Sequence, residues 1–384
     1  MQILWKVLGG ILRFFGMQNY ILFEAEPAKR ENTEAVFNEM LRRGLNKRYK
    51  LVLCSYAPEL LKDRKSKNVL VERHVKFGES KAALRRMRWL RLRSRLIIDE
   101  NQQISKLDPK TTRVYLTHGS CLKSVREYYN CKPDADFMLN QAEFWKPINA
   151  YEFRISEDKL VTLGYPRNDI LFSSDLDPQE FLGRTFAKLV VWYPTYRQLN
   201  GYREKGNYNG SVTIPVIHDE AAARRINEYA AKHDVLLVVK PHPVQYVSYI
   251  KELQLDHLIM VNDRFFMEHH TPDYAFIAKA DALITDYSSV VFDYMLTEKP
   301  IALTLEDLEE YKKQIGIAID MDLLRSCSAV LNSPEDFDAF FADLVNGNDP
   351  LRERRLEVMH LTNRYTDGNS AKRVVDWLET FLKK

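Results

Sequence analysis

Residues 282–303, ALITDYSSVVFDYMLTEKPIAL, decide the fold prediction. The short apolar run Ala282–Thr285 predicts a buried strand, and the polar string DYSS after it predicts a turn. The segment Val290–Leu296 has helical character, and a second β-rich run, Pro300–Leu303, follows it. A strand, a helix and a second strand in this order are typical of a parallel pair joined by a crossover helix.

The same alternation of β-rich and helical stretches extends along the rest of the chain. The predicted strands are Tyr20–Glu24, Lys50–Ser55, Val69–Val71, Arg113–Thr117, Lys159–Leu163, Leu189–Trp192, Val235–Val239, His257–Met260, Ala282–Thr285 and Pro300–Leu303. Strands that alternate with helices predict an α/β fold with parallel sheets. The polar, Gly/Asn-rich stretch Thr195–Ser211 predicts a long loop, which is either a mobile lid or a surface excursion.

Length and charge indicate an ordinary globular protein with two domains. The chain has 384 residues, 45% of them hydrophobic, and about 150 residues per domain favours two domains. We expect the boundary near residue 185, after the acidic stretch SSDLDPQEF, which gives domains of 1–185 and 186–384. Lys and Arg number 56 against 53 Asp and Glu, and a net charge of +3 argues against a protein whose whole surface binds nucleic acid.

The cysteines and the metal-ligating residue types form no convincing site. The four cysteines are widely spaced and form no CxxC pair: Cys54, Cys121, Cys131 and Cys327. We expect reduced thiols in a cytosolic protein. Four residues of metal-ligating types lie close together: Glu268, His269, His270 and Asp273. They precede a helix in a linker, so we expect no metal ion there.

The N-terminal segment MQILWKVLGGILRFFG has the pattern of an amphipathic helix. Apolar residues recur at helical spacing from Ile3 to Phe15, and Trp5, Lys6 and Arg13 lie off that stripe. The run is too short and too charged to span a bilayer, and its internal charges argue against a signal peptide. The pattern fits a helix in a membrane interface and a helix packed on the protein's own core equally well.

A strongly basic segment favours the membrane interpretation. Between Lys81 and Ile98 there are seven basic residues and no acidic one: Lys81, Arg85, Arg86, Arg88, Arg91, Arg93 and Arg95. Each basic side chain near an anionic bilayer contributes on the order of 1 kcal/mol to binding. A solvated helix face is the main alternative, and no nucleic-acid motif accompanies a third interpretation, a nucleic-acid groove. The candidate membrane-associating residues are Trp5, Lys6, Arg13, Arg85, Arg86, Arg88 and Arg91.

Polar groups suited to phosphate follow five of the predicted strands, where ligands of open α/β sheets bind. His118 follows Arg113–Thr117, and a neutral histidine there suits a general base for a hydroxyl nucleophile. Arg167, in the string GYPRND after Lys159–Leu163, could pair with a phosphate. A histidine bonded to neighbouring backbone is the alternative for His118. In GYPRND, the alternative is that Asn168 or Asp169 simply caps a helix.

Three strand ends in the second half of the chain carry similar groups. YPTYR supplies the hydroxyl of Thr195 and the guanidinium of Arg197, and KPHP places His242 between two prolines that restrict its backbone. In TDYSS, which also contains Asp286, a serine is predicted to cap a helix whose free N–H groups attract phosphate. The candidate caps are Ser288 and Ser289. Rigid turns and ordinary capping are the alternatives, and the absence of GxGxxG and GxxxxGK[ST] disfavours nucleotide folds of those types.

Six motifs in chain order together resemble the CDP-glycerol glycerophosphotransferase family of teichoic-acid and capsule synthesis. They are HGSCLKSV, LGYPRND, VWYPTYR, KPHP, ITDYSSVVFDYMLTEKP and DGNSAKRVVDWL. The resemblance implies a GT-B fold with the active site in a cleft between two Rossmann-like domains. It also implies transfer of glycerol phosphate, or ribitol phosphate in relatives, from a CDP-alditol to a lipid-linked acceptor, with release of CMP. Thr117 and Ser120 depart from the family's usual WHGT string.

The resemblance also implies roles for individual residues and domains. His118 is similar to the family's base; His242, Ser288 and Ser289 resemble its pyrophosphate binders. Arg167 and Arg197 stand in donor-site motifs. The first domain would carry the membrane-associating and acceptor-side elements, and the second would bind the CDP-alditol, with the last helix packing back on the first.

The partners and location follow from the same resemblance. We expect a CDP-alditol, a lipid-linked glycan acceptor and an anionic membrane surface as partners, no cofactor and no nucleic acid, with a homo-oligomer left open. The expected location is the cytoplasmic face of the plasma membrane. The alternatives are a GT-B glycosyltransferase that uses a nucleotide sugar, and a membrane- or nucleic-acid-binding protein that relies on the basic segment.

Overall fold

The structure is a computed structural model that describes residues 2–25, 32–74, 81–101, 104–126, 133–195, 214–241 and 253–382. Arg197, His242, Cys131 and most of the predicted loop Thr195–Ser211 lie outside the described residues. Contacts divide the chain into two compact units. Unit 1 comprises Met1–Ser120, Asn130–Asp169 and Asp367–Lys384, and unit 2 comprises Cys121–Tyr129 and Ile170–Thr366.

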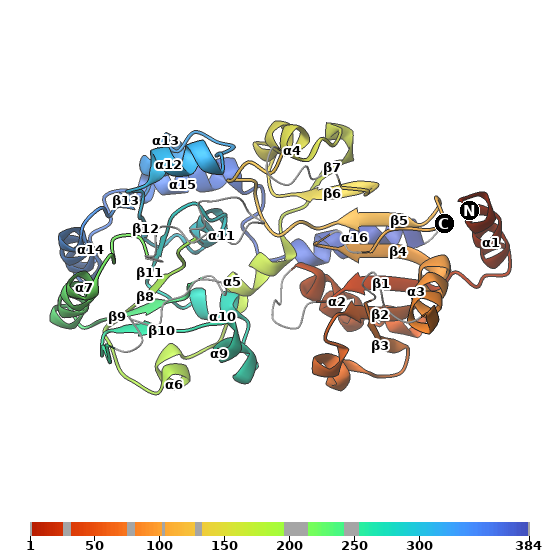
Figure 1. Cartoon of the computed structure of the whole chain (residues 1–384), viewed down its shortest axis with the longest axis horizontal. Coiled ribbons are helices and arrows are strands. Elements are labelled where there is room, and N and C mark those ends of the chain that lie inside the picture. Colours follow the sequence, from red (N-terminus) through yellow and green to blue (C-terminus); the bar gives the residue numbers. More distant parts are fainter. Residues whose placement is uncertain are drawn as a thin grey trace. The chain divides into compact units, whose positions relative to one another are not determined.

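Unit 1 is built on a seven-stranded parallel sheet in the order β3-β2-β1-β4-β5-β6-β7 (Figure 1). Its strands are β1 (Tyr20–Glu24), β2 (Lys50–Ser55), β3 (Val69–Arg73), β4 (Ser94–Asp99), β5 (Thr112–Tyr115), β6 (Phe137–Asn140) and β7 (Leu160–Thr162). Its described helices are α1 (Gln2–Phe14), α2 (Asn32–Arg42), α3 (Lys81–Arg93), α4 (Trp145–Phe153) and α16 (Ser370–Leu382).

Helices cover both faces of the unit 1 sheet, which explains why β1, YILFE, is buried along its whole length. On one face, Phe37 of α2 and Leu378 of α16 pack with Phe23 and Leu53. On the other, Leu90 of α3 lies in a smaller cluster with the opposite side of β1 and β2. The inner strand β1 therefore reads as a nearly continuous apolar run rather than as an alternating one.

Unit 2 is built on a six-stranded parallel sheet in the order β10-β9-β8-β11-β12-β13. Its strands are β8 (Lys188–Trp192), β9 (Val235–Val239), β10 (Leu258–Met260), β11 (Ala282–Thr285), β12 (Ile301–Leu303) and β13 (Ala329–Val330). Its described helices are α5 (Ile170–Ser173), α6 (Pro178–Leu182), α7 (Glu220–Lys232), α9 (Asp263–Glu268), α10 (Asp273–Ile277), α11 (Val290–Tyr294), α12 (Leu308–Gln314), α13 (Asp322–Arg325), α14 (Pro334–Asn346) and α15 (Arg352–Thr362).

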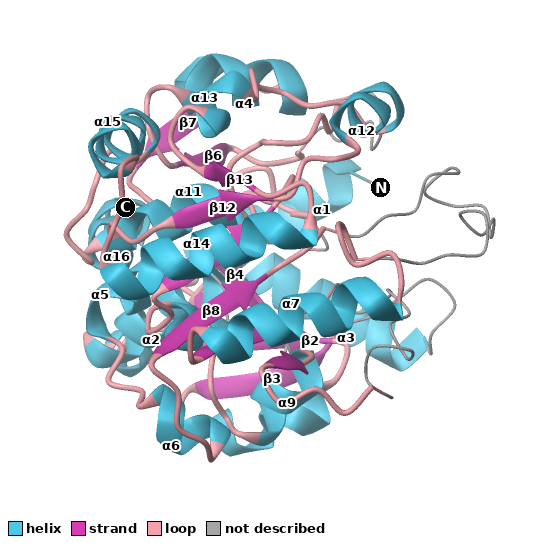
Figure 2. Cartoon of the chain, turned by 90° about the vertical axis from the view of Figure 1, so that its left-hand side faces the viewer, coloured by secondary structure: helices cyan, strands magenta, loops and turns pink. Residues whose placement is uncertain are grey.

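Helices α7 and α14 lie side by side on one face of the unit 2 sheet (Figure 2). Ile226 of α7 and Phe337 of α14 are fully buried against Trp192 and Val190 of β8. Asp219 caps the start of α7 by accepting from Ala222 N at 2.8 Å. This packing leaves the carboxyl ends of the parallel strands as the edge where connecting loops gather.

All ten predicted strands are present, and the described residues contain three more. Of these, β4 follows α3 within the basic segment, because the helix ends at Arg93 and Ser94 begins the strand. Arg95 therefore lies on a strand and not on the helix with the other basic residues. The strands β6 and β13 have four and two residues, too short to stand out in the sequence.

The division between the units falls at 169/170, whereas we expected a boundary near 185. The segment between these positions packs in unit 2. Phe181 of α6 contacts the rings of Phe265 and Phe276, with centroids 5.3 Å and 5.5 Å apart, and Ser174 Oγ donates to Ala275 O at 2.8 Å. Unit 1 instead includes α16, whose Val374 and Leu378 lie in the same core as α2.

Candidate active site

His118 lies just beyond the carboxyl end of β5, and its side chain is exposed. The backbone on either side of it is unusual, because Thr117 has φ 53° and Gly119 has φ 137°. A non-glycine residue in the left-handed region costs on the order of 1–3 kcal/mol, and the surrounding structure must hold it there. The chain therefore turns sharply at the residue predicted to be the general base.

Two residues far away in the sequence hold this turn. Arg167 donates from Nη1 to His118 O at 2.8 Å, and Asn32 donates from Nδ2 to Thr117 O at 3.0 Å. Asn32 Oδ1 in turn accepts from Arg167 N at 3.0 Å. Arg167 is 6% exposed and Asn32 is fully buried. The structure thus places Arg167 in unit 1, where its side chain binds the His118 turn.

The rest of the GYPRND string anchors the C-terminal helix. Asp169 accepts from Ser370 N and Ala371 N, both at 2.8 Å, and thereby caps α16. Burial raises the pKa of Asp169, and the two backbone N–H groups oppose that shift. The capping that we considered for Asp169 is present, but the capped helix starts 201 residues later in the chain.

In unit 2, Asp286 binds the strand end that carries Thr195. Its carboxylate accepts from Thr195 N at 2.9 Å and 3.0 Å, from Thr195 Oγ1, and from Tyr287 N at 2.6 Å. Asp286 is fully buried and Thr195 is 8% exposed. The loops after β8 and β11 are therefore joined through one carboxylate, and the structure brings Thr195 and Asp286 together.

Ser288 and Ser289 are half-buried at the start of α11. Ser289 occupies the cap position without a side-chain capping bond, and Ser288 Oγ accepts from Val290 N at 3.5 Å. The predicted helix is short, because α11 ends at Tyr294 and a 3₁₀ turn, Met295–Thr297, completes it.

Sequence reasoning missed a charged cluster beside the KPHP string. Lys240 Nζ lies 2.7 Å from Asp263 Oδ1, 3.4 Å from Asp273 Oδ2 and 5.2 Å from the centroid of the Tyr193 ring. Burial opposes the charge on Lys240, but Asp273 and Asp263 together outweigh burial and raise its pKa. Burial also raises the pKa of the Tyr193 hydroxyl well above its usual value. The sequence offered one signal for this cluster: Lys240 directly follows a strand, and Asp263 and Asp273 each begin a helix.

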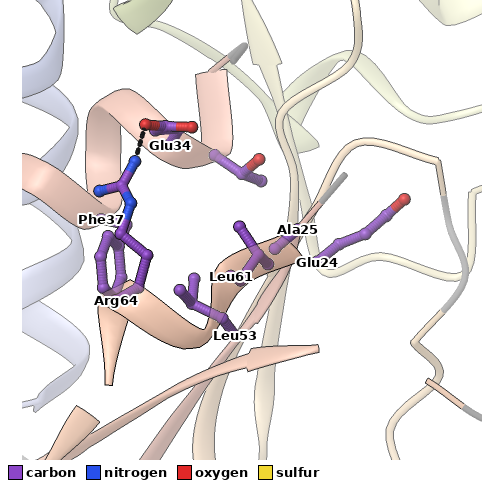
Figure 3. A pocket seen from close by; sticks show the side chains of 8 residues that line it. Glu24, Ala25, Glu34, Phe37, Leu53, Leu61 and Arg64 are labelled. Carbon is purple, nitrogen blue, oxygen red and sulfur yellow. Dashed lines mark hydrogen bonds and ion pairs between the residues drawn. The ribbon is translucent and has the colours of Figure 1, made fainter. Parts of the chain in front are cut away.

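A small pocket opens at the carboxyl ends of β1 and β2 in unit 1 (Figure 3). It is lined by Glu24, Ala25, Thr33, Glu34, Phe37, Leu53, Leu61 and Arg64 and has a volume of about 20 Å³. That volume suffices for about one water molecule. The Glu34–Arg64 ion pair lies on one side of it, and the Glu24 carboxylate accepts from Glu100 N and from Asn101. The pocket is too small to hold a nucleotide.

The candidate membrane-associating residues lie on α1 and α3, which pack against each other. Leu12 of α1 is buried, while Phe14, Phe15, Val7 and Ile11 are 85%, 68%, 53% and 49% exposed. The basic and aromatic candidates are distributed as follows: Lys6, Arg85, Arg86 and Arg88 are exposed, and Trp5, Arg13 and Arg91 are half-buried.

Several of these side chains have partners within the protein. Arg13 pairs with Asp108, Arg86 pairs with Glu72, and Arg91 donates to Ser105. Burial lowers the pKa of Arg91 to about 10. Among the described residues, no helix combines the length and the apolar character needed to cross a bilayer, and no group of metal-ligating side chains could hold an ion.

Two units with parallel sheets, covered by helices and carrying polar groups at the carboxyl ends of their strands, define an α/β protein of the GT-B class. The chain belongs to the CDP-glycerol:poly(glycerophosphate) glycerophosphotransferase family, whose model matches residues 11–380. The family predicted from the six motifs is therefore confirmed, and so is the predicted fold class.

Curated relatives are enzymes of teichoic acid synthesis. The chain is 24% identical to the teichoic acid ribitol-phosphate polymerase TarL of Staphylococcus aureus, over 97% of this chain and 65% of the relative. It is 22% identical to the teichoic acid glycerol-phosphate primase of Bacillus subtilis, over 67% of this chain and 61% of the relative. The chain thus spans less than two thirds of the length of either relative.

A solved structure, that of the wall teichoic acid polymerase TagF, has the same fold. One TagF variant matches with a TM-score of 0.69 and 15% identity, over 100% of this chain and 98% of that chain. A second TagF variant, soaked with CDPG, matches with a TM-score of 0.69 and 16% identity over 95% of this chain and 90% of that chain.

Proposed function

We propose that this protein transfers glycerol phosphate, or a related alditol phosphate, from a CDP-alditol to a hydroxyl of a lipid-linked cell-surface glycan precursor. The observation that carries the proposal is the family match over residues 11–380, together with an exposed histidine at the sheet edge where that family's HG string falls. Relatives named as ribitol-phosphate and glycerol-phosphate enzymes support an alditol phosphate as the transferred group.

The proposed reaction is an in-line phosphoryl transfer. The acceptor hydroxyl loses its proton to His118 while its oxygen forms a bond to the alditol-bearing β-phosphorus. The bond between that phosphorus and the bridging oxygen breaks, and CMP leaves with the electron pair. His118 then carries the proton until solvent removes it, so atoms and charge balance without a further reactant.

We assign stabilisation of the charge on the CMP leaving group to unit 2. The candidates are His242, Arg197 and the serines Ser288 and Ser289. All four offer hydrogen-bond donors to a diphosphate, and the Arg197 guanidinium adds a positive charge. The Asp286–Thr195 contacts support this assignment indirectly, because they hold the strand end from which Arg197 follows.

We further propose that α1 and the exposed arginines of α3 hold the protein at an anionic membrane surface. Four large apolar side chains of residues 7–15 are about half exposed or more, which a helix packed wholly on its own core would not leave in water. Arg85 and Arg88 lie exposed on the adjacent helix and would face the lipid phosphates. A lipid-linked acceptor makes such a location useful, because acceptor and enzyme then meet on one surface.

The experiment that tests the proposed base is CMP release by the purified protein, with CDP-glycerol and a lipid-linked acceptor. We expect His118→Ala to lower kcat by about 10²–10⁴-fold, because the acceptor oxygen then has no positioned base. His360→Ala is the matched control, since His360 is an exposed histidine on α15 and should be without effect. A rate for His118→Ala equal to that of the wild type would remove His118 from the base role.

A further inference from the structure

The peptide groups on both sides of His118 are held by buried hydrogen bonds. The Thr117 carbonyl belongs to the peptide bond before His118, and the His118 carbonyl belongs to the one after it. Asn32 binds the first at 3.0 Å and Arg167 binds the second at 2.8 Å. Two fixed peptide planes determine φ and ψ of the residue between them, and therefore the direction of its Cα–Cβ bond.

Asn32 can perform this task because an amide donates and accepts at once. Its Nδ2 donates to a carbonyl and its Oδ1 accepts from Arg167 N at 3.0 Å, so the orientation of the amide is fixed by its partners. Asn32 is fully buried at the start of α2, 85 residues before Thr117 in sequence. An aspartate of the same size could accept from Arg167 N but could not donate to Thr117 O.

Arg167 is itself held in place. It lies on the 3₁₀ turn Pro166–Asp169, and Asn168 N donates to Tyr165 O at 3.0 Å. Asp169, two residues after Arg167, accepts from the first backbone N–H groups of α16. The guanidinium carbon also lies 5.7 Å from the centroid of the Tyr165 ring. These contacts, which order the Arg167 side chain, come from within unit 1.

We propose that Asn32 and Arg167 are positioning residues that aim the His118 imidazole at the acceptor hydroxyl. This inference rests on the proposed function, in which His118 is the base. It gives Arg167 a different task from the donor contact expected from its motif. The left-handed conformation at Thr117 is consistent with it, because a strained turn beside a reacting group persists only where neighbours hold it.

The test compares Asn32→Asp with the wild type in the CMP-release assay. We expect kcat to fall about 10²-fold, because a small misplacement of a catalytic group costs about that much, while KM for CDP-glycerol stays the same. Asn38→Asp is the matched control, since Asn38 is exposed on the same helix and should keep the wild-type rate. A wild-type kcat for Asn32→Asp would overturn the proposal.

A double-mutant cycle separates positioning from a general structural defect. In the His118→Ala background, Asn32→Asp should cause no further loss of kcat, because there is no imidazole left to aim. An equal loss in both backgrounds would overturn the proposal. A His118→Ala variant with the wild-type rate would instead refute the proposed base, so the two failures are distinguishable.

Arg167→Lys provides a second variant if Asn32→Asp does not fold. Lysine keeps the positive charge but loses the planar fork that reaches His118 O. Positioning predicts a lower kcat at constant KM for CDP-glycerol. A higher KM at constant kcat would show that Arg167 binds the donor and would overturn its positioning role.

Discussion

Asp286 shows, at the scale of single residues, how one buried carboxylate joins two loops that lie far apart in the sequence. Its carboxylate accepts from Thr195 and from Tyr287 N, and it is fully buried. A buried carboxylate remains charged at low cost only where such donors surround it. It holds the strand end at Thr195, and under the proposed function the groups that follow this strand end would bind the donor phosphates.

We predict that Asp286→Asn lowers the free energy of unfolding by roughly 1–3 kcal/mol, because an amide nitrogen would face N–H donors and leave one buried donor unsatisfied. The KM for CDP-glycerol should rise more than kcat falls, since the donor-side loop loosens. Denaturant unfolding and initial rates measure the two effects. Asp322→Asn, at an exposed position on α13, is the control and should change neither. An unchanged KM for Asp286→Asn would contradict the assignment.

Sequence reasoning placed His118 at a strand end correctly, because a histidine directly after a strand has a local signal. It could not find the hydrogen bond of Arg167 to a carbonyl 49 residues earlier, or that of Asn32 to a carbonyl 85 residues later. Hydrogen bonds between distant segments leave no periodicity in the sequence. The same limit explains why the capping role of Asp169 was considered but the helix that it caps was not foreseen.

At the scale of elements, the docking of α16 onto α2 completes unit 1. Arg43, just after α2, lies between the two helices. It donates to Glu39 at 2.7 Å, to Asp376 at 2.6 Å and to Lys372 O at 2.9 Å, and its side chain is 17% exposed. Tyr49 OH donates to Leu382 O at 2.9 Å at the end of the same helix. These contacts join the two ends of the chain in one core.

We predict that Arg43→Gln lowers the free energy of unfolding by roughly 1.5–3 kcal/mol near pH 7, because the hydrogen bonds of its charged guanidinium are lost. The pKa of Glu39 is lowered by its hydrogen bond to Arg42 and, against burial, by Arg43. The stability that ionised Glu39 contributes to the fold is therefore complete above its unfolded pKa of about 4.5. This contribution is lost as the pH falls through the lower pKa of the folded state.

The difference between Arg43→Gln and the wild type should consequently shrink below about pH 4.5, as urea titrations at several pH values would show. Arg42→Gln is the comparison variant: its side chain is 68% exposed, so solvent screens its pair with Glu39, and we expect a smaller loss than for Arg43→Gln. A constant difference across this pH range would exclude the carboxylates as its source.

The fold was predictable where strands are apolar and their helices periodic, as in β1, β9 and β11. The strand β4 was not predictable, because Arg95 near its start reads as one more basic residue of the preceding helix. The two-residue β13 offers no pattern at all. Short or charged strands are specified by their neighbours in the sheet, which the local sequence does not reveal.

At the scale of the whole molecule, the near-neutral net charge of +3 conceals a strongly uneven distribution. Exposed Arg85, Arg86 and Arg88 lie on α3, next to the exposed apolar residues of the N-terminal segment. An apolar stripe beside a basic helix is typical of proteins that bind an anionic membrane surface. The membrane proposal therefore concerns one surface and not the overall charge.

We predict that the double variant Phe14→Ser and Phe15→Ser binds anionic vesicles at least about ten-fold more weakly than the wild type, because two exposed rings can no longer enter the interface. Sedimentation with phosphatidylglycerol vesicles measures this, with phosphatidylcholine vesicles as the neutral reference. Phe172→Ser, at an exposed phenylalanine on α5 in unit 2, is the control. Equal binding by all three proteins would refute a membrane role for these rings.

The transfer of an alditol phosphate is tested most directly by following both products of one reaction. The wild-type protein is incubated with a lipid-linked glycan acceptor and CDP-glycerol or CDP-ribitol labelled in the alditol, with UDP- and GDP-sugars in parallel. We expect one CDP-alditol to give CMP and lipid-bound label in equal amounts, with neither nucleotide sugar consumed. Consumption of a nucleotide sugar, or no label on the acceptor with either CDP-alditol, would contradict the proposed function.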